Sequence, residues 1–432
     1  MAMQVEKLVT DMHPALTRHE ASVEADRCYF CHDAPCVTAC PTGIDIPVFI
    51  RQISTGNPLG AAATIFRENI FGGMCARDCP TETLCEQGCV RNTAEEQPVR
   101  IGDLQRFATD AMMETGKQSW ARAADTGKKV AVVGAGPAGI ACAHRLAVHG
   151  HSVTVFDAND KAGGLNEYGI AAYKTVDDFA QRELEYILSI GGIKIEAGKK
   201  LGDSVSLDQL VSDYDAVFLG MGLGGVNALE VPGNDLSGVE DAVAFISDLR
   251  QAEDFQTLKM PANVVVIGGG MTAVDAAMQA KLLGAEHVTI AYRRGVENMN
   301  ASEEEQHLAQ THGVVINPWL QPRAVHGSGG DVSSIEFDVT RLDGNKLGST
   351  GETVTLTADK VFCAIGQTLA EELELPAGIV VDGGRIAVDE NGQTGHPSIW
   401  AGGDCAATGE DLTVSAVQDG KLAAEAIHRS LG

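Results

Sequence analysis

VAVVGAGPAGIACAHRLAVHGHSVTVFD, at residues 130–157, decides the fold of this chain. An apolar run there meets a glycine turn, and the turn opens a segment whose apolar residues recur at helical spacing. A second apolar run, SVTVFD at 152–157, follows at once. The pattern predicts a buried strand, a helix and a second, parallel strand.

The glycine turn of this unit has the spacing of a dinucleotide fingerprint, with Gly134, Gly136 and Gly139 at its three positions. The first glycine permits a tight turn, the second lets the backbone approach a pyrophosphate, and the third allows close packing of helix and strand. The helix N-terminus favours the phosphate charge. Asp157 closes the second strand, 23 positions after Gly134, where it would accept a hydrogen bond from a ribose hydroxyl.

Residues 263–294 repeat the design as NVVVIGGGMTAVDAAMQAKLLGAEHVTIAYRR. The fingerprint positions here are Gly268, Gly270 and Ala273. The second strand ends in Arg293 and Arg294, where an NAD-specific site would place an acid. Guanidinium groups suit a 2′-phosphate and so indicate NADPH, although a solvated basic pair at a strand end is the alternative interpretation.

Two dinucleotide sites in one chain predict one tightly held flavin, FAD, and one exchangeable nicotinamide coenzyme. The later sequence AGGD at 401–404 would place Gly403 and Asp404 near the ribityl–phosphate region of the flavin. The closing amphipathic helix, which starts near Val414, would direct its N-terminus at the isoalloxazine.

Eight of the 11 cysteines lie between Cys28 and Cys89. Cys28, Cys31, Cys36 and Cys40 read C-x2-C-x4-C-x3-C-P, and Cys75, Cys79, Cys85 and Cys89 read C-x3-C-P-x5-C-x3-C. Iron–sulfur clusters need several soft thiolate ligands, and a cysteine before a proline commonly reaches across to a second cluster. We therefore expect two [4Fe-4S] clusters with crossed ligation. The alternatives are free or disulfide-bonded thiols and structural zinc sites, but zinc sites usually pair two C-x2-C knuckles and only one such spacing occurs.

These motifs predict an α/β chain: a helical two-cluster iron–sulfur domain followed by two Rossmann-like nucleotide-binding domains, the second inserted in the first. Residues 1–125 form the helical domain, 126–236 the first part of the FAD domain, 237–360 the NAD(P) domain and 361–432 the second part of the FAD domain. The last segment is too short for a domain of its own, so it is expected to complete the first nucleotide domain.

Composition excludes several functions. Lys and Arg total 32 against 59 Asp and Glu, and aromatic residues make up 5%, which opposes a nucleic-acid partner. No uninterrupted apolar stretch is long enough for a membrane span, and the first residues lack the pattern of a secretory signal. A cytoplasmic protein is therefore expected, and in that reducing compartment clustered thiols indicate metal or redox chemistry before disulfides.

Several other residues are interpreted as structural. Cys142, Cys363 and Cys405 are expected to be small buried side chains, and no C-x2-C follows Cys89 to support a dithiol mechanism. Ser302 and Glu305 form the pattern of a helix-capping box. His144, His149 and His151 are expected to be surface or helix-capping groups. No catalytic side chain is predicted beyond those that position cofactors.

The motifs together resemble a known family over essentially the whole chain. They are CYFCHDAPCVTACPTGIDI, CARDCPTETLCEQGC, IGDLQRFATD, GAGPAG, GGLNEYGIAAYK, GGGMTAVDAA and AGGD. The chain is similar to the electron-input subunits of bacterial NAD-dependent dihydropyrimidine dehydrogenases and to the N-terminal half of the long single-chain enzymes. It is more distantly similar to the small subunit of glutamate synthase.

The resemblance implies a ligand set that spacing alone does not choose. One cluster would be held by Cys28, Cys31, Cys36 and Cys89. The other would be held by Cys40, Cys79, Cys85 and Gln105, which leaves Cys75 as a bystander. Glutamate synthase small subunits tend to carry Glu at the position of Gln105 and lack the HDAP insert.

The resemblance also implies two further sets of cofactor contacts. FAD would lie near Ala138, Leu165, Lys174, Leu201 and Thr413, and the nicotinamide dinucleotide near Gly269, Gly270, Thr272, Arg293, Arg294 and Gly366. This chain departs from the family at Met271, where relatives usually have Asp. It also has Asn300 where NADPH-using long forms carry a third basic residue, so NADH and NADPH both remain candidates.

The implied function is electron input: NAD(P)H reduces FAD, and electrons pass through two [4Fe-4S] clusters to an FMN-containing partner subunit that reduces uracil or thymine to the 5,6-dihydro form. The chain itself has no further domain for a pyrimidine, so a hetero-oligomer is expected. The alternatives are a glutamate synthase small subunit, a reductase that feeds ferredoxin, and a non-catalytic scaffold with vestigial sites.

Overall fold

The computed structural model describes residues 8, 10–344, 346–369, 375–376 and 378–432. The chain forms two compact units. The larger unit comprises His13–Glu167, Asp178–Gly225 and Thr368–Gly432, and the smaller unit Tyr168–Asp177, Val226–Gln367 and the described part of the first twelve residues. Residues 1–7 and 9 of the expected 1–125 domain, and residues 370–374 and 377 of the 361–432 segment, lie outside the described residues. The four predicted domain boundaries stay predictions.

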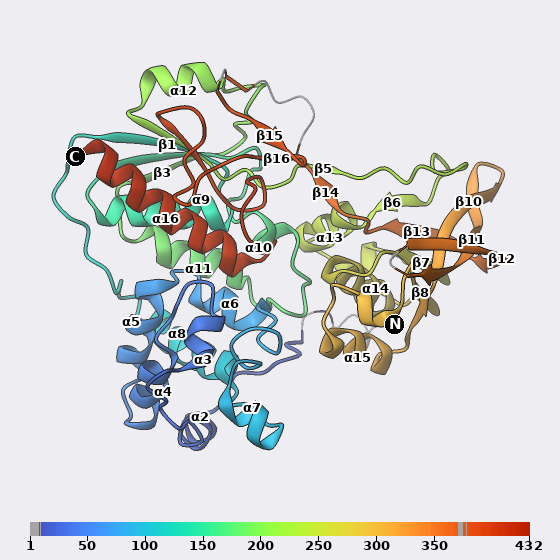
Figure 1. The fold of residues 1–432 in the computed structure, drawn as a ribbon, viewed down its shortest axis with the longest axis horizontal. Helices are drawn as coiled ribbons and strands as arrows, with labels where there is room; N and C mark the ends of the chain where they lie inside the picture. Colours follow the sequence, from blue (N-terminus) through green and yellow to red (C-terminus); the bar gives the residue numbers. More distant parts are fainter. Residues whose placement is uncertain (1–7, 9, 345, 370–374, 377) are drawn as a thin grey trace. The chain divides into compact units, whose positions relative to one another are not determined.

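The N-terminal part of the larger unit is helical (Figure 1). Its helices are α2 (Arg18–Ala25), α3 (Pro35–Ala39), α4 (Ile46–Ser54), α5 (Pro58–Glu68), α6 (Gly72–Asp78), α7 (Val90–Glu95) and α8 (Ile101–Glu114). Asp45 and Asn57 cap α4 and α5 with their side chains, and a proline in the first turn of each helix needs no amide donor there. Phe49 and Phe66 are among the buried side chains of these helices.

The rest of the larger unit is built on a parallel five-stranded sheet in the order β17-β4-β1-β2-β3. The strands are β1 (Lys129–Val133), β2 (Ser152–Phe156), β3 (Ile193–Glu196), β4 (Ala216–Leu219) and β17 (Ile399–Ala401). The helices are α9 (Pro137–Val148), α10 (Leu165–Tyr168), α11 (Phe179–Leu188), α12 (Leu207–Asp213) and α16 (Thr413–Leu431). Because β17 pairs with β4, the C-terminal segment completes this sheet.

Helices α9 and α16 lie side by side (Figure 1). Gly420 permits this approach, because a Cβ atom at that position would overlap the carbonyl oxygen of Ala138 on α9. Both helices therefore sit close to the first glycine turn.

The smaller unit contains a second parallel sheet in the order β6-β13-β7-β8-β9. Its strands are β6 (Val239–Asp241), β7 (Asn263–Ile267), β8 (His287–Tyr292), β9 (Val314–Pro318) and β13 (Lys360–Cys363), and its helices are α13 (Ala242–Gln251), α14 (Met271–Leu282) and α15 (Glu303–Thr311). Phe245 and Phe362 stack in its core, with ring centroids 4.3 Å apart.

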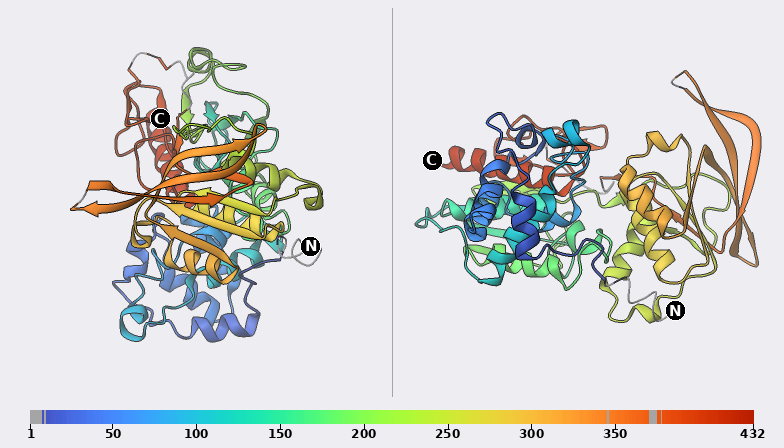
Figure 2. Two further views of the ribbon diagram at one scale, coloured as in Figure 1. Left: turned by 90° about the vertical axis from the view of Figure 1, so that its right-hand side faces the viewer. Right: turned by 90° about the horizontal axis from the view of Figure 1, so that it is seen from below.

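An antiparallel sheet forms a further, curved layer of the smaller unit (Figure 2). It consists of β10 (Leu320–Ser328), β11 (Asp331–Asp343) and β12 (Lys346–Thr357). The remaining short strands are β5 (Gly225–Val226), β14 (Gln367–Thr368), β15 (Val381–Asp382) and β16 (Arg385–Ile386). The second nucleotide-type sheet lies between two parts of the first along the chain, which confirms the predicted fold class. Among the described residues no helix combines the length and apolar character that crossing a membrane requires.

Burial confirms one structural expectation and corrects another. Cys142, Cys363 and Cys405 are buried, as expected. His144 and His151 are also buried, at 2% and 1% exposure, so their assignment as surface or capping groups was wrong. His144 lies on the face of α9 that packs inward, with its ring edge-on to Trp120, and local sequence gave no sign of that contact.

Candidate cofactor sites

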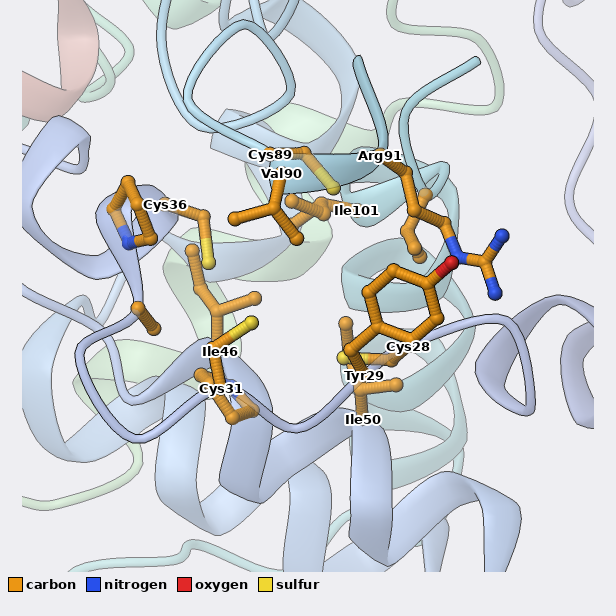
Figure 3. A pocket seen from close by; sticks show the side chains of 14 residues that line it. Cys28, Tyr29, Cys31, Cys36, Ile46, Ile50, Cys89, Val90, Arg91 and Ile101 are labelled. Carbon is orange, nitrogen blue, oxygen red and sulfur yellow. The ribbon is translucent and has the colours of Figure 1, made fainter. Parts of the chain in front are cut away.

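Four cysteines from three stretches of the chain line one pocket: Cys28, Cys31, Cys36 and Cys89 (Figure 3). Their sulfur atoms face a common space, and most of the other lining side chains are apolar. Cys36 lies on α3, and Cys89 is the residue that precedes α7. Four soft donors converging in an apolar chamber fit an iron–sulfur cluster. These are the residues predicted for the first cluster, and their ligation stays a prediction.

The thiols of this pocket are held in the neutral form when no metal compensates their charge. Burial raises the pKa of Cys36 to about 12, and the nearby Cys89 and Cys28 add to the shift. Burial likewise raises the pKa of Cys28. Iron would supply the positive charge that makes these thiolates stable, so assembly should release protons.

The loop between Cys28 and Cys31 contains a backbone amide that donates a hydrogen bond to a cysteine sulfur. The amide of Phe30 donates to Cys28 Sγ at 3.4 Å, and Phe30 adopts a left-handed conformation with φ 53° to do so. Arg51 lies over the Phe30 ring, 4.8 Å from its centroid. Amide donors to a ligating sulfur raise the reduction potential of a cluster.

The remaining cysteines of the array form a second group. The amide of Cys79 donates to the carbonyl oxygen of Cys75 at 3.0 Å, and the neighbouring Cys75 thiol together with burial raises the pKa of Cys79. The neighbours of Cys85 include Glu86 and Cys40. Burial and these neighbours raise the pKa of Cys85, with burial the larger cause.

Gln105 lies on α8, which packs against α6, the helix that carries Cys75. Its Nε2 donates to the carbonyl oxygen of Gly72 at 2.7 Å, and its Oε1 has no hydrogen-bond partner among the described residues. An oxygen left open in this way suits a metal ligand. Cys75 and Gln105 lie on neighbouring helices, so the choice between them as the fourth ligand stays a prediction.

Sequence reasoning missed Glu183, a buried carboxyl group at the N-terminus of α6. It accepts hydrogen bonds from the amides of Gly73 (2.7 Å) and Met74 (3.1 Å). These two residues directly follow Gly72, whose carbonyl oxygen accepts the hydrogen bond from Gln105. Burial raises the pKa of Glu183 to about 8. In sequence Glu183 is one polar residue of an amphipathic helix, and no local pattern distinguishes it.

The first glycine turn has the close contacts that the fingerprint requires. Gly134 has φ 98°, and a Cβ atom there would overlap the carbonyl oxygen of Gly220. A Cβ atom at Gly139 would overlap the carbonyl oxygen of Gly134. At Gly136 the nearest neighbour of such an atom would be Gly164 at 3.7 Å, so space remains in front of the turn. This cradle fits a dinucleotide pyrophosphate.

Asp157 has a role in this turn that the sequence did not reveal. Its Oδ2 accepts from the amide of Ala135 (2.6 Å), and its Oδ1 accepts from the amide of Asn159 (2.8 Å). The carboxylate therefore fixes the glycine turn itself. The predicted contact with a ribose hydroxyl would use a remaining lone pair and stays a prediction.

Further predicted FAD residues gather near the start of α16. Thr413 Oγ1 donates to Asn166 Oδ1 at 3.0 Å, and Asn166 Nδ2 is buried without a partner among the described residues. Asp419 on the same helix accepts from the amide of Gly403 at 2.9 Å. Burial raises the pKa of Asp404 to about 6. A buried amide donor beside Thr413 fits a polar ligand such as the flavin.

The other residues predicted around FAD are distributed over both units. Ala138 lies in the first turn of α9, Leu165 begins α10 and is exposed, and Leu201 is half-buried. Lys174 belongs to the smaller unit, where its Nζ contacts Asp275 (3.1 Å) and Glu305 (2.7 Å). Glu305 was interpreted from sequence as a capping residue; its amide does bond to Ser302 Oγ, but its side chain belongs to this buried charge cluster.

The second glycine turn also leaves space for a ligand. Gly268 has φ 149°, and a Cβ atom there would overlap the carbonyl oxygen of Ala364. Gly269 lies against the ring of Tyr292, whereas a Cβ atom at Gly270 would meet no atom within 4 Å. Thr272 and Ala273 follow in the first turn of α14, after Met271. This open backbone fits a dinucleotide.

The predicted coenzyme-selecting residues follow β8. Arg293 and Arg294 are exposed, and the described residues provide neither with an ion-pair partner. Gly366 has φ 102° and lies after β13, the neighbour of β7. The two guanidinium groups are available to a phosphate.

Comparison with protein families divides the chain into two matched segments. Residues 128–420 match the family described as pyridine nucleotide-disulphide oxidoreductase. Residues 5–117 match the family described as dihydropyrimidine dehydrogenase domain II, 4Fe-4S cluster.

Two curated proteins of Escherichia coli (strain K12) are similar along almost their full lengths. The NAD-dependent dihydropyrimidine dehydrogenase subunit PreT is 36% identical over 430 residues, which cover 99% of this chain and 98% of that protein. The glutamate synthase (NADPH) small chain is 34% identical over 443 residues, which cover 96% of this chain and 93% of that protein.

Among solved structures, FprA from Mycobacterium tuberculosis in complex with NADPH has a TM-score of 0.59. The two proteins are 19% identical, and the similarity covers 71% of this chain and 85% of FprA. At this identity the likeness concerns the fold.

Proposed function

Because this chain belongs to the pyridine nucleotide-disulphide oxidoreductase family and carries the iron–sulfur segment found in dihydropyrimidine dehydrogenases, we propose that it is the electron-input subunit of a dihydropyrimidine dehydrogenase. It is an oxidoreductase with FAD, NAD(P)H and [4Fe-4S] cofactors, as the sequence predicted. The observation that carries the proposal is the similarity to PreT over 99% of the chain, cysteine segment included.

Bound cofactors would supply hydride transfer at the flavin and single-electron transfer at the clusters. The chain's own residues hold and orient these groups. The turns at Gly134 and Gly268 would approach the two pyrophosphates with backbone amides, at the N-termini of α9 and α14. Asp157 keeps the first turn in place through the amide of Ala135. Such positioning needs no side-chain nucleophile.

The proposed ligands of one cluster are Cys28, Cys31, Cys36 and Cys89, and those of the other are Cys40, Cys79, Cys85 and Gln105. The shared pocket supports the first set. The open Oε1 of Gln105 supports the second. Electrons leaving the flavin would pass singly through both clusters before reaching the partner.

The partner in this proposal is a separate subunit with FMN and the pyrimidine site, so the active form is a hetero-oligomer. The test is to purify the chain with its host's own partner and to measure NADH and NADPH oxidation with uracil. The pair should reduce uracil, while the single chain should reduce only dyes. Uracil reduction by the pure single chain would contradict this division of labour.

The similarity to a glutamate synthase small chain defines the second candidate. Gln105, in place of the Glu that the resemblance associates with those subunits, argues against it. Glutamine and 2-oxoglutarate should therefore give no NAD(P)H oxidation with the purified pair. Glutamate formation would favour the second candidate instead.

A further inference from the structure

A lysine near the C-terminus of the chain contacts the loop that contains one of the proposed cluster ligands. Lys421 lies on α16, and its Nζ donates to the carbonyl oxygens of Thr42 (3.2 Å) and Glu68 (3.0 Å) and to Glu68 Oε2 (3.0 Å). Three donated hydrogen bonds use all the protons of an ammonium group, so this geometry describes a charged lysine. Its side chain is only 14% exposed.

The contacted loop follows Cys40 directly. Cys40 Sγ and Thr42 Oγ1 are 3.3 Å apart, and the amide of Gly43 donates to the carbonyl oxygen of Cys40. Thr42 is itself buried, with 3% exposure. Lys421 and Cys40 thus contact the same residue, Lys421 at the carbonyl oxygen of Thr42 and Cys40 at its hydroxyl group. The cation is therefore beside a proposed ligand of the second cluster, without being bonded to it.

The residues just before Lys421 contact the proposed FAD site. Asp419 accepts a hydrogen bond from the amide of Gly403, and Gly420 lies against the carbonyl of Ala138. Three consecutive residues of α16 thus touch the AGGD loop, the helix after the first glycine turn, and the Cys40 loop. Helix α16 therefore connects the proposed FAD site with the loop of the second cluster, the two sites between which an electron would have to pass.

We propose that Lys421 is a positioning residue that also sets the reduction potential of the cluster bound through Cys40. The inference rests on the proposed function, because it takes Cys40 as a ligand. Reduction adds one electron, supplied by the reduced flavin, and hence one negative charge to the cluster. A buried cation nearby stabilises the reduced form more than the oxidised form and raises the potential.

Glu68 moderates this effect but does not cancel it. Its side chain is 36% exposed against 14% for Lys421, so water screens the carboxylate more than the ammonium. Arg145 adds a second positive charge in the neighbourhood. Arg145 is itself paired with Glu425 at 3.6 Å, so the buried Lys421 ammonium remains the less screened charge beside Cys40. Removing this ammonium should lower the reduction potential, and removing the Glu68 carboxylate should raise it.

The test is a redox titration of the full chain, followed by the electron paramagnetic resonance signals of its reduced clusters. Lys421→Met should shift one of the two potentials to a more negative value, and Glu68→Gln should shift the same potential to a more positive one. Lys421→Arg keeps the charge and should lie near the wild type. The signal that changes should be the one altered by Cys40→Ser.

Opposite shifts distinguish an electrostatic role from a purely structural one, because loosening the loop would not reverse its effect between Lys421→Met and Glu68→Gln. Unchanged potentials in assembled Lys421→Met protein, or shifts of the same sign in both variants, would overturn the inference. If the Lys421→Met protein does not assemble its clusters, Glu68→Gln alone is the test: a more positive potential supports the inference, and an unchanged or more negative potential overturns it. If Cys40→Ser leaves both signals and the iron content unchanged, the proposed ligand set fails instead.

Discussion

Acidification should destabilise this protein through one buried histidine, His144. Burial lowers the pKa of His144 to about 3, and the charge of Arg145 adds to the shift. In the unfolded chain the imidazole has a pKa of about 6.5. An imidazole whose pKa is lowered by folding stays neutral in the folded state, so as the pH falls the unfolded state binds the proton first. The titration of His144 therefore does not reduce the free energy of unfolding above about pH 6.5, and it reduces this free energy progressively as the pH drops toward 3.

The size of the loss follows from the pKa difference. Each pH unit between the two values costs about 1.4 kcal/mol, so at pH 5 the free energy of unfolding should be lower by about 2 kcal/mol. His144→Phe removes the titration and keeps an aromatic ring edge-on to Trp120. It also removes Nε2, which is buried without a hydrogen-bond partner among the described residues.

The measurement is urea unfolding of the wild type and His144→Phe at pH 8 and pH 5. The wild type should lose about 2 kcal/mol more than the variant between these pH values. His32→Phe is the matched control, because the His32 side chain is fully exposed. If the wild type and His144→Phe lose the same stability, the buried neutral imidazole is not the cause and the reasoning fails.

Three further predictions concern the cofactors. Gln105→Ala should lose about half of the bound iron by elemental analysis, whereas Cys75→Ala should keep it; the reverse result would assign the ligand to Cys75. Replacing Arg293 and Arg294 with Ala should raise the KM for NADPH more than tenfold while leaving the KM for NADH nearly unchanged, because each charge-assisted contact contributes about 1.5–3 kcal/mol; equal effects on both coenzymes would refute a phosphate role. Gly134→Ala should lose most of the bound FAD, measured by absorbance, because its backbone has φ 98° and its Cβ atom would overlap a neighbouring carbonyl; full FAD content would show that the turn tolerates a side chain.

The parts of the fold that sequence predicted are those encoded locally. The apolar runs around Gly134 and Gly268 became β1 and β7, and the closing amphipathic segment became α16, because each depends on neighbours within a few residues. The helical character predicted for the cysteine-rich segment is likewise present in α2 to α8. The close spacing of the cysteines in the sequence also predicted that several of them would meet in space, as Cys28, Cys31, Cys36 and Cys89 do around one pocket.

The contacts that sequence did not predict join residues far apart in the chain. Lys421 and Thr42 are 379 positions apart, and Lys174 and Glu305 are 131 apart. Glu305 has the local pattern of a helix cap, which the Ser302 contact fulfils, and nothing nearby indicates its second, buried role. Which polar side chain is buried in a charge cluster depends on tertiary packing, so no periodicity or spacing could reveal it.

The immediate surroundings of Gln105 favour an amide over a carboxylate at this position. The carbonyl oxygen of Gly72 faces the Gln105 side chain at 2.7 Å, a distance that requires a donor. A glutamate carboxylate at this position would place one of its oxygens against the Gly72 carbonyl oxygen, and both atoms are acceptors. The carboxylate would therefore have to turn away, and the orientation that leaves Oε1 of Gln105 without a partner would be lost. Glu183 holds the amides of Gly73 and Met74 on the same turn, which restricts any adjustment of the Gly72 carbonyl. The backbone around Gly72 is thus fitted to glutamine, the residue that the dihydropyrimidine dehydrogenase resemblance implies, and opposes the glutamate that it associates with glutamate synthase small subunits.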